Sequence, residues 1–137
     1  MSDGLSALDA PPAPAFVAPD RELAKLPVRL RSEDITDFCR RHGVDWLALF
    51  GSVLRDDFDE KSDVDFLVDF LPGRTPAWFG VALEEELAEL VNRDVDLRTP
   101  REISLLFLRQ VLRDARTIYR SGGTWKSDRP LSARDRR

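Results

Sequence analysis

Two apolar segments joined by a polar loop constrain the fold of this chain more than any other feature. Residues 44–50, VDWLALF, have the length and apolarity of a buried strand. Residues 62–70, SDVDFLVDF, form a second run of this kind, and Pro72 and Gly73 follow it. Both runs are short for helices, so the sequence predicts two strands of one sheet.

Helical periodicity appears before and between these strands. Residues 32–42 predict a helix that begins with Ser32 as the N-cap and ends before Gly43, which takes the left-handed conformation. Residues 76–91 predict an amphipathic helix, in which leucines recur every three to four residues and four glutamates occupy the other side. The glutamates form a solvated face or, alternatively, a docking site for a basic partner.

Residues 94–119 predict one more strand and one more helix. Residues 94–98, DVDLR, predict a short third strand. Thr99, Pro100 and Glu102 supply an N-cap, a first-turn proline and a capping-box acid, so we expect a final helix from there to about Tyr119. This helix is apolar around more of its circumference than one core face requires, so a protein partner or self-association would cover the remainder.

These elements predict the α/β (α+β) class, with a small mixed β-sheet of three or four strands backed by helices. Residues 1–27 are rich in proline and alanine and predict a flexible N-terminal arm. The folded domain is expected at residues 28–120, and residues 121–137, with paired glycines and mixed charge, predict a flexible tail.

Composition narrows the class of protein. The chain has 137 residues, 42% of them hydrophobic, which is enough for one core. It has no signal-peptide pattern and no apolar run of membrane-spanning length, so we expect a cytoplasmic protein with no membrane partner. A net charge of −4 argues against direct binding of nucleic acid, and the single Cys39 predicts core packing rather than a disulfide.

Three aspartates form the candidate chemical site. Asp63 and Asp65 alternate at the head of the second strand, so both carboxylates point to one face and can hold hard cations. Asp96 adds a third carboxylate if its strand lies beside the second one. Three acids around two Mg²⁺ ions suit in-line phosphoryl transfer. Asp94 is a competing third ligand, although its place at the strand start favours solvation.

A phosphate-binding turn precedes this acidic pair. Gly51 allows a phosphate to approach the backbone closely, and Ser52 begins a short helical turn that offers a hydroxyl and amides to triphosphate oxygens. Arg55, one turn later, adds positive charge. Ten residues separate Ser52 from Asp63, so the sequence predicts a site made of two parts.

The combination of Gly51-Ser52, Asp63-x-Asp65 and the later Asp96 resembles the motif set of the DNA polymerase beta-like nucleotidyltransferase superfamily. Within that superfamily, LFGSVLRDDFDEKSDVDFLVDF and the later VDLRTPREISLLFLRQVLRDARTIY resemble the minimal nucleotidyltransferases of the MntA antitoxin type. The resemblance covers residues 44–119. The chain departs from the pattern at Leu54 and Asp56, which flank the arginine where small residues are usual.

The resemblance implies a function as well as a fold. Such proteins are antitoxins of type VII (HEPN/MNT) toxin–antitoxin systems, which transfer AMP from ATP to a tyrosine of a HEPN-domain RNase toxin. By resemblance, Asp63, Asp65 and Asp96 are metal ligands, and Asp96 is also the candidate general base. Gly51 and Ser52 bind phosphate, while Arg55 and Ser62 match accessory positions.

Two alternative functions remain open from the sequence. An antitoxin could neutralise its toxin by binding and occlusion alone, using the apolar last helix as the interface. A small-molecule nucleotidyltransferase is the other alternative, although such enzymes usually need an added domain to shape the acceptor pocket, and the chain leaves little length for one.

Overall fold

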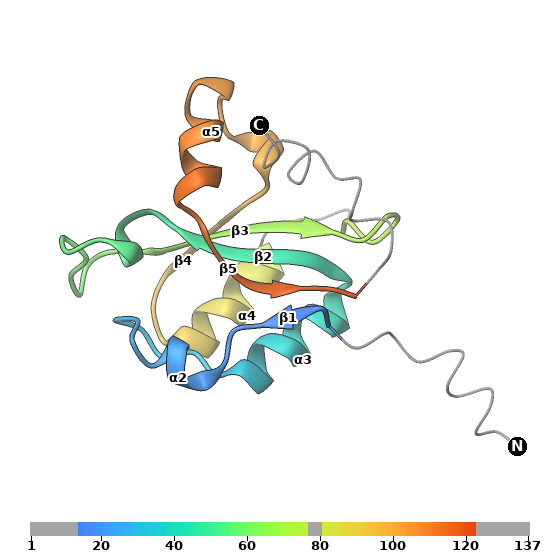
Figure 1. Cartoon of the computed structure of the whole chain (residues 1–137), viewed down its shortest axis with the longest axis horizontal. Coiled ribbons are helices and arrows are strands. Elements are labelled where there is room, and N and C mark those ends of the chain that lie inside the picture. The colour runs from blue at the N-terminus through green and yellow to red at the C-terminus, as the bar shows by residue number, and fades with distance from the viewer. Residues whose placement is uncertain (1–13, 77–80, 123–137) are drawn as a thin grey trace, which may run out of the picture.

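A computed structural model describes residues 14–76 and 81–122 of the chain (Figure 1). Its central feature is a five-stranded sheet with the order β1-β5-β2-β3-β4. The strands are β1 (Phe16–Val17), β2 (Val44–Phe50), β3 (Val64–Phe70), β4 (Val95–Arg98) and β5 (Arg116–Arg120). The pair β3 and β4 is parallel and the other pairs are antiparallel, so the sheet is mixed, as predicted.

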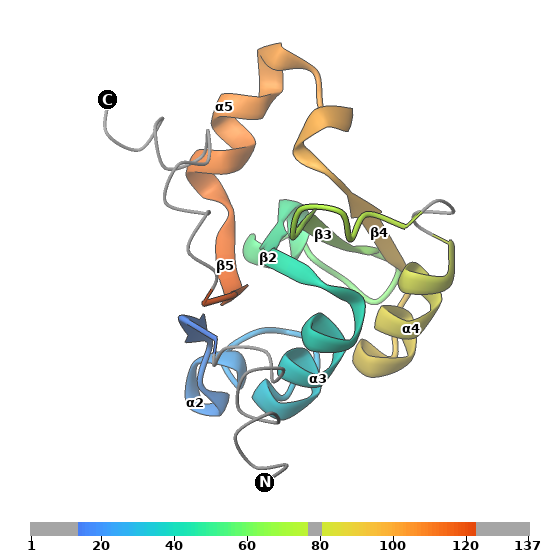
Figure 2. The ribbon, with the colours of Figure 1, turned by 90° about the vertical axis from the view of Figure 1, so that its right-hand side faces the viewer.

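The helices lie on both faces of the sheet. Helices α2 (Asp20–Leu23), α3 (Ser32–His42) and α4 (Val81–Val91) cover one face, and α5 (Leu105–Asp114) stands on the other (Figures 1 and 2). Two 3₁₀ turns, η1 (Gly51–Leu54) and η2 (Pro100–Glu102), follow β2 and β4. Helix α4 forms the crossover that the parallel pairing of β3 and β4 requires. No helix in the described ranges has the length and apolarity of a membrane span.

Side chains of β2 and β3 point alternately to the two faces of the sheet, which divides the core into two parts. Leu47, Phe66 and Val68 pack with Phe38 and Leu87 in the main core beneath α3 and α4. A smaller cluster on the opposite face contains a different set of side chains, Trp46, Ala48 and Leu67, with Phe50, Ile103, Val111, Leu112 and Ala115 packed against them. Strands β2 and β3 therefore contribute to the core on both faces, which explains why most of their residues are apolar.

The ends of α3 show how local chemistry fixes the elements. The helix spans the predicted residues, but the side chain of Ser32 does not cap it; instead the Ser32 amide donates to Asp20 Oδ1 of α2 at 2.8 Å. Gly43 ends the helix with φ of 68°, as predicted, and the Arg74 side chain lies where a Cβ of residue 43 would be. Cys39 is fully buried within the helix.

The final element of the fold differs from the prediction of one helix up to Tyr119. Helix α5 begins later, where Ser104 Oγ accepts from the Leu106 amide, and it ends at Asp114. Residues 116–120 form β5, which pairs with β2 and fills a central place in the sheet. The β-branched and aromatic residues Thr117, Ile118 and Tyr119 favour a strand, and pairing along β2 outweighs the helical continuation.

The segment before Val28 also differs from the expectation of a loose arm. In its described part, β1 pairs with β5, α2 forms a short helix, and Leu23 is buried in the main core. Residues 1–13, most of the predicted C-terminal tail and residues 77–80, which include Trp78, lie outside the described residues. Of the tail, Ser121 is buried and donates its hydroxyl hydrogen to Asp45 Oδ1 at 2.5 Å.

Candidate active site

The register of the parallel strand pair brings two of the three predicted acids together. Asp65 of β3 and Asp96 of β4 are directly paired residues. Both are half-buried, and Asp65 points to the face opposite Val64 and Phe66, which belong to the main core. Asp63 is exposed and lies one residue before β3. The site therefore lies on the α5 face of the sheet, at the start of β3.

The three carboxylates influence one another electrostatically. Burial, and then the negative charges of Asp96 and Asp63, raise the pKa of Asp65 from 3.8 to about 6. Arg98 and Arg55 act in the opposite direction but do not cancel this shift. The charges of Asp96 and Asp63 thus disfavour ionisation of Asp65, and a bound cation would relieve this effect.

Two arginines lie beside the acids. Arg98 Nε donates to Asp96 Oδ2 at 2.9 Å, and this contact raises the pKa of Arg98 further. Arg55 follows η1 and forms an exposed ion pair with Asp57, with Nε and Oδ1 at 3.4 Å. Exposed ion pairs of this kind are weak, so a phosphate group can compete for the Arg55 guanidinium.

The predicted phosphate-binding turn lies next to Asp65. Phe50, the last residue of β2, pairs with Asp65, so Gly51 begins the turn beside that carboxylate. Gly51 has φ of 79°, and a Cβ at this position would overlap Asp65 Oδ2. Only glycine satisfies both the conformation and the close approach. Ser52 is half-buried in the 3₁₀ turn that the sequence predicted, and buried Val53 anchors this turn to the core.

A compact loop leads from this turn to Asp63. Within it, Asp59 Oδ1 accepts from the Ser62 hydroxyl at 3.1 Å, and the Ser62 oxygen accepts from the Asp59 amide at 3.0 Å. Arg93 Nη2 donates to the carbonyl oxygens of Asp59 and Ser62 at 2.5 and 2.8 Å, and its guanidinium lies 4.6 Å from the centre of the Phe58 ring. Arg93 therefore fixes the loop that places Asp63.

The chemical type of the candidate ligands suits a hard divalent cation. Asp63, Asp65 and Asp96 offer only carboxylate oxygens, which Mg²⁺ prefers, and their mutual repulsion favours a dication. Among the described residues, no three such side chains already converge as a metal cluster. Asp96 instead accepts a hydrogen bond from Arg98. When bound, Mg²⁺ would neutralise phosphate charge. The chain itself would contribute the carboxylates, the glycine turn and the two arginines.

Three residues near the site were not singled out from the sequence. Arg98 follows Asp96 by two positions, so strand alternation was a signal for it. Glu84 of α4 accepts from the Leu97 amide at 2.9 Å and thereby holds the edge strand beside Asp96. Arg93, the third, lies 30 residues after Asp63 along the chain, and nothing in the sequence pattern connects it with that loop.

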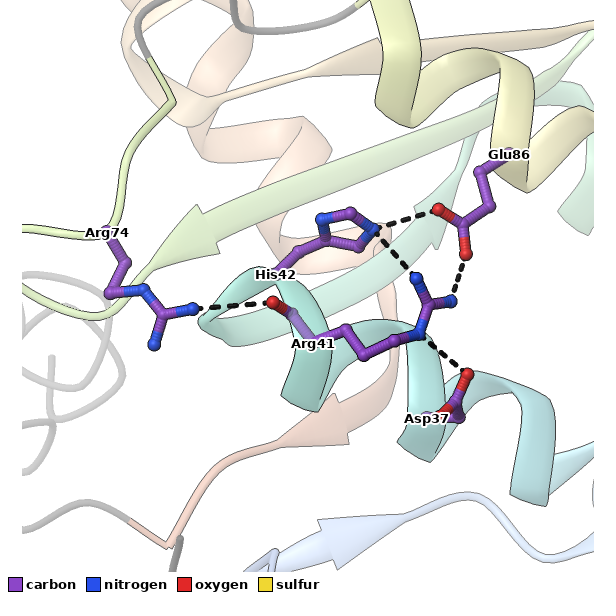
Figure 3. A network of polar contacts seen from close by, with 5 residues as sticks. All are labelled: Asp37, Arg41, His42, Arg74 and Glu86. Atoms are coloured by element: carbon purple, nitrogen blue, oxygen red, sulfur yellow. Dashed lines mark hydrogen bonds and ion pairs between the residues drawn. The ribbon is translucent and has the colours of Figure 1, made fainter.

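A second polar network lies away from this site, between α3 and α4 (Figure 3). Glu86 bonds both Arg41 and His42, with His42 Nε2 and Glu86 Oε1 at 2.9 Å, and Arg41 Nε also donates to Asp37. Arg74 reaches the Arg41 carbonyl. These contacts join α3 to α4. His42, the only histidine of the chain, therefore links two helices, and Glu86 of the predicted glutamate face is bonded rather than simply solvated.

The family model described as polymerase beta, nucleotidyltransferase matches residues 33–122. The chain belongs to this nucleotidyltransferase family. The match begins in α3 and extends past β5, so it contains every site residue named above. Nucleotidyl transfer is therefore the class of reaction to which the carboxylates and the glycine turn are suited.

Individual relatives agree with this assignment. A protein of Methanocaldococcus jannaschii, named a putative protein adenylyltransferase, is 36% identical over 75 residues, which are 55% of this chain and 80% of that protein. The solved structure of a putative minimal nucleotidyltransferase is 36% identical, with a TM-score of 0.52, and the match covers 61% of this chain and 84% of that one. A chain in a crystal structure of a toxin–antitoxin with AMP-PNP is 25% identical, with a TM-score of 0.52, and the match covers 74% of this chain and 81% of that one.

Proposed function

We propose that this chain is the antitoxin of a type VII (HEPN/MNT) toxin–antitoxin system. It is a Mg²⁺-dependent protein adenylyltransferase that acts in the cytoplasm. It transfers AMP from ATP to a tyrosine of its cognate HEPN-domain toxin and thereby neutralises that RNase. The coarser part of this function, nucleotidyl transfer, follows from family membership. The acceptor protein and the modified residue type follow from the resemblance to MntA-like antitoxins.

One observation carries the catalytic part of the proposal. Asp65 and Asp96 are paired across parallel strands, and Gly51 begins a turn that only glycine can form beside Asp65. This arrangement supports the proposed roles, because carboxylates that could bind metal lie next to a backbone turn that a triphosphate can approach. A phosphate chain held at Gly51 would lie within reach of cations bound by the acids.

Each site residue then has a role. Asp63, Asp65 and Asp96 bind the metal ions, which we expect to number two, and Asp96 also accepts the proton of the attacking hydroxyl. Gly51 and Ser52 bind the triphosphate of ATP, and Arg55 adds positive charge to it. The role of Ser62 is accessory. Its hydroxyl belongs to the loop that leads into Asp63, so its first contribution is to place that carboxylate.

The comparisons support a protein as the acceptor. A relative whose name includes protein adenylyltransferase matches over most of its own length, and a structural neighbour belongs to a toxin–antitoxin with a bound ATP analogue. The pattern of exposure supports it as well, because α5 carries large apolar side chains in solvent. The same exposure is what an antitoxin acting by occlusion alone would need, so occlusion is the second candidate function.

Intact-mass spectrometry separates the two. The protein encoded by the neighbouring gene is incubated with ATP, Mg²⁺ and either this chain or its Asp63→Asn/Asp65→Asn variant, and Asp94→Asn serves as the matched control. Adenylyl transfer predicts a mass gain of one or more AMP units with the wild-type chain and the control, and no gain with the double variant. An unmodified protein in a stable complex would refute transfer and support occlusion.

A further inference from the structure

Helix α5 carries three of the five large apolar side chains that are exposed in the described ranges. Leu105, Leu106 and Phe107 are consecutive, and their exposed fractions are 83%, 87% and 62%. No residue of α5 is fully buried. Apolar side chains this exposed, grouped at one end of a helix, are typical of a surface that a partner covers.

The later turns of α5 already have their packing. Val111 and Leu112 lie against the cluster of Trp46, Ala48 and Leu67 on the sheet. Helix α5 has ten residues, too few for a stable helix without tertiary contacts, so this packing is what keeps it folded. The three exposed side chains are not part of this packing.

The exposed side of the helix is basic as well as apolar. Leu106, Arg109 and Arg113 follow one another at spacings of three and four residues, so they share one face of the helix. None of the ion pairs within the described ranges includes Arg109 or Arg113. We call the surface formed by Leu105, Leu106, Phe107, Arg109 and Arg113 the α5 ridge.

Helix α5 and the candidate active site share one face of the sheet. Helix α5 lies on the same face of the sheet as Asp65, and it is the one helix of the described chain on that face (Figure 2). Phe50, which pairs with Asp65 and precedes Gly51, packs against the same buried cluster as Val111 and Leu112 of α5. A protein that brings a hydroxyl group to Asp65 and Asp96 must approach from this face, and it meets α5 there.

We propose that the α5 ridge is the docking surface for the protein that receives the nucleotide. The surface it fits is an apolar patch bordered by carboxylates, which pair with Arg109 and Arg113. A second copy of this chain fits less well, because a two-fold contact through the ridge would bring the arginines of both copies together. This inference rests on the proposed function only in taking the acceptor to be a protein.

The test measures binding and transfer separately. The purified product of the neighbouring gene is titrated with the wild-type chain, with Leu106→Glu and with Arg109→Glu/Arg113→Glu. Val81→Glu on α4 is the matched control, because Val81 is 66% exposed on the other side of the sheet. Binding of AMP-PNP by each variant and its thermal unfolding show whether the site and the fold are intact.

Docking on the α5 ridge predicts that Leu106→Glu and the double arginine variant weaken binding about tenfold or more, whereas Val81→Glu and AMP-PNP binding stay at the wild-type level. Equal binding by all four proteins would overturn the inference and leave the proposed function standing. A wild-type dimer that Leu106→Glu dissociates would identify a second copy as the occupant and also overturn it. Tight wild-type binding without AMP transfer would refute the proposed function and the assignment of the bound protein as the acceptor, whereas weaker binding by Leu106→Glu would still locate the docking surface on the ridge.

Discussion

Replacing Asp65 with asparagine should stabilise the chain when no divalent cation is present. The pKa of Asp65 rises from 3.8 to about 6 because the residue is buried near Asp96 and Asp63. A shift of this size corresponds to about 3 kcal/mol of unfavourable ionisation at neutral pH. Asp65 is only half-buried, so solvent screening reduces the expected gain in unfolding free energy to about 1 to 2 kcal/mol.

The pH dependence of this gain has a definite sign. The folded state binds the Asp65 proton more tightly than the unfolded state, so this group lowers the stability of the wild-type chain as pH rises from 3.8 toward about 6. The difference in unfolding free energy between Asp65→Asn and wild type should therefore be small below that window and complete above it. Mg²⁺ should stabilise the wild-type chain and have a smaller effect on the variant.

Urea unfolding in metal-free buffer measures these differences directly. Wild type, Asp65→Asn and the exposed-site control Asp94→Asn are compared at neutral pH and at a pH below 3.8, the ordinary value for this carboxyl. A variant that is no more stable than wild type at neutral pH would refute the reasoning. So would a stability gain of the same size at both pH values, because the gain would then not come from ionisation.

Three further predictions follow from contacts around the site. Gly51→Ala should abolish AMP transfer and lower the unfolding free energy by about 1 to 2 kcal/mol, because the new Cβ would overlap the Asp65 carboxylate and residue 51 has φ of 79°. AMP incorporation and urea unfolding measure the two effects. Arg93→Ala should raise the Mg²⁺ concentration needed for half-maximal activity about three- to tenfold in a metal titration, because the loop before Asp63 loses two hydrogen bonds. Arg93→Lys should be less affected. Glu84→Ala should cost about 1 kcal/mol in chemical denaturation by leaving the Leu97 amide unpaired, whereas Glu84→Gln, which keeps an acceptor, should cost less.

Much of the central fold could be predicted from local sequence. The strand at residues 44–50, the helix at residues 32–42 and the left-handed Gly43 were predicted correctly, because apolar run length, helical spacing and glycine conformation are local properties. The last strand was missed for a physical reason. Thr117, Ile118 and Tyr119 have strand-favouring side chains, but they directly follow a helical pattern, and pairing with β2 decides that they form a strand. The pairing itself is tertiary and cannot be read from the segment.

In the candidate site, too, the features set by local sequence were predicted and those set by tertiary contacts were not. Alternation placed Asp65 on one face of its strand, and the expectation that Asp96 would lie beside it is confirmed by the strand register. The roles of these residues remain proposals. Arg93 could not be predicted from the sequence, because its contacts depend on how the end of α4 lies beside the loop before β3. Likewise, nothing within α2 indicated that Asp20 would bond the first turn of α3.

The most direct test of the central claim is a crystal structure of this chain with AMP-PNP and Mn²⁺, with anomalous scattering used to locate the metal. We expect Mn²⁺ to be bound by the carboxylates of Asp63, Asp65 and Asp96, with the triphosphate against Gly51 and Ser52 and Asp96 turned away from Arg98. Mn²⁺ and nucleotide bound elsewhere on the chain, with these aspartates unchanged, would contradict it.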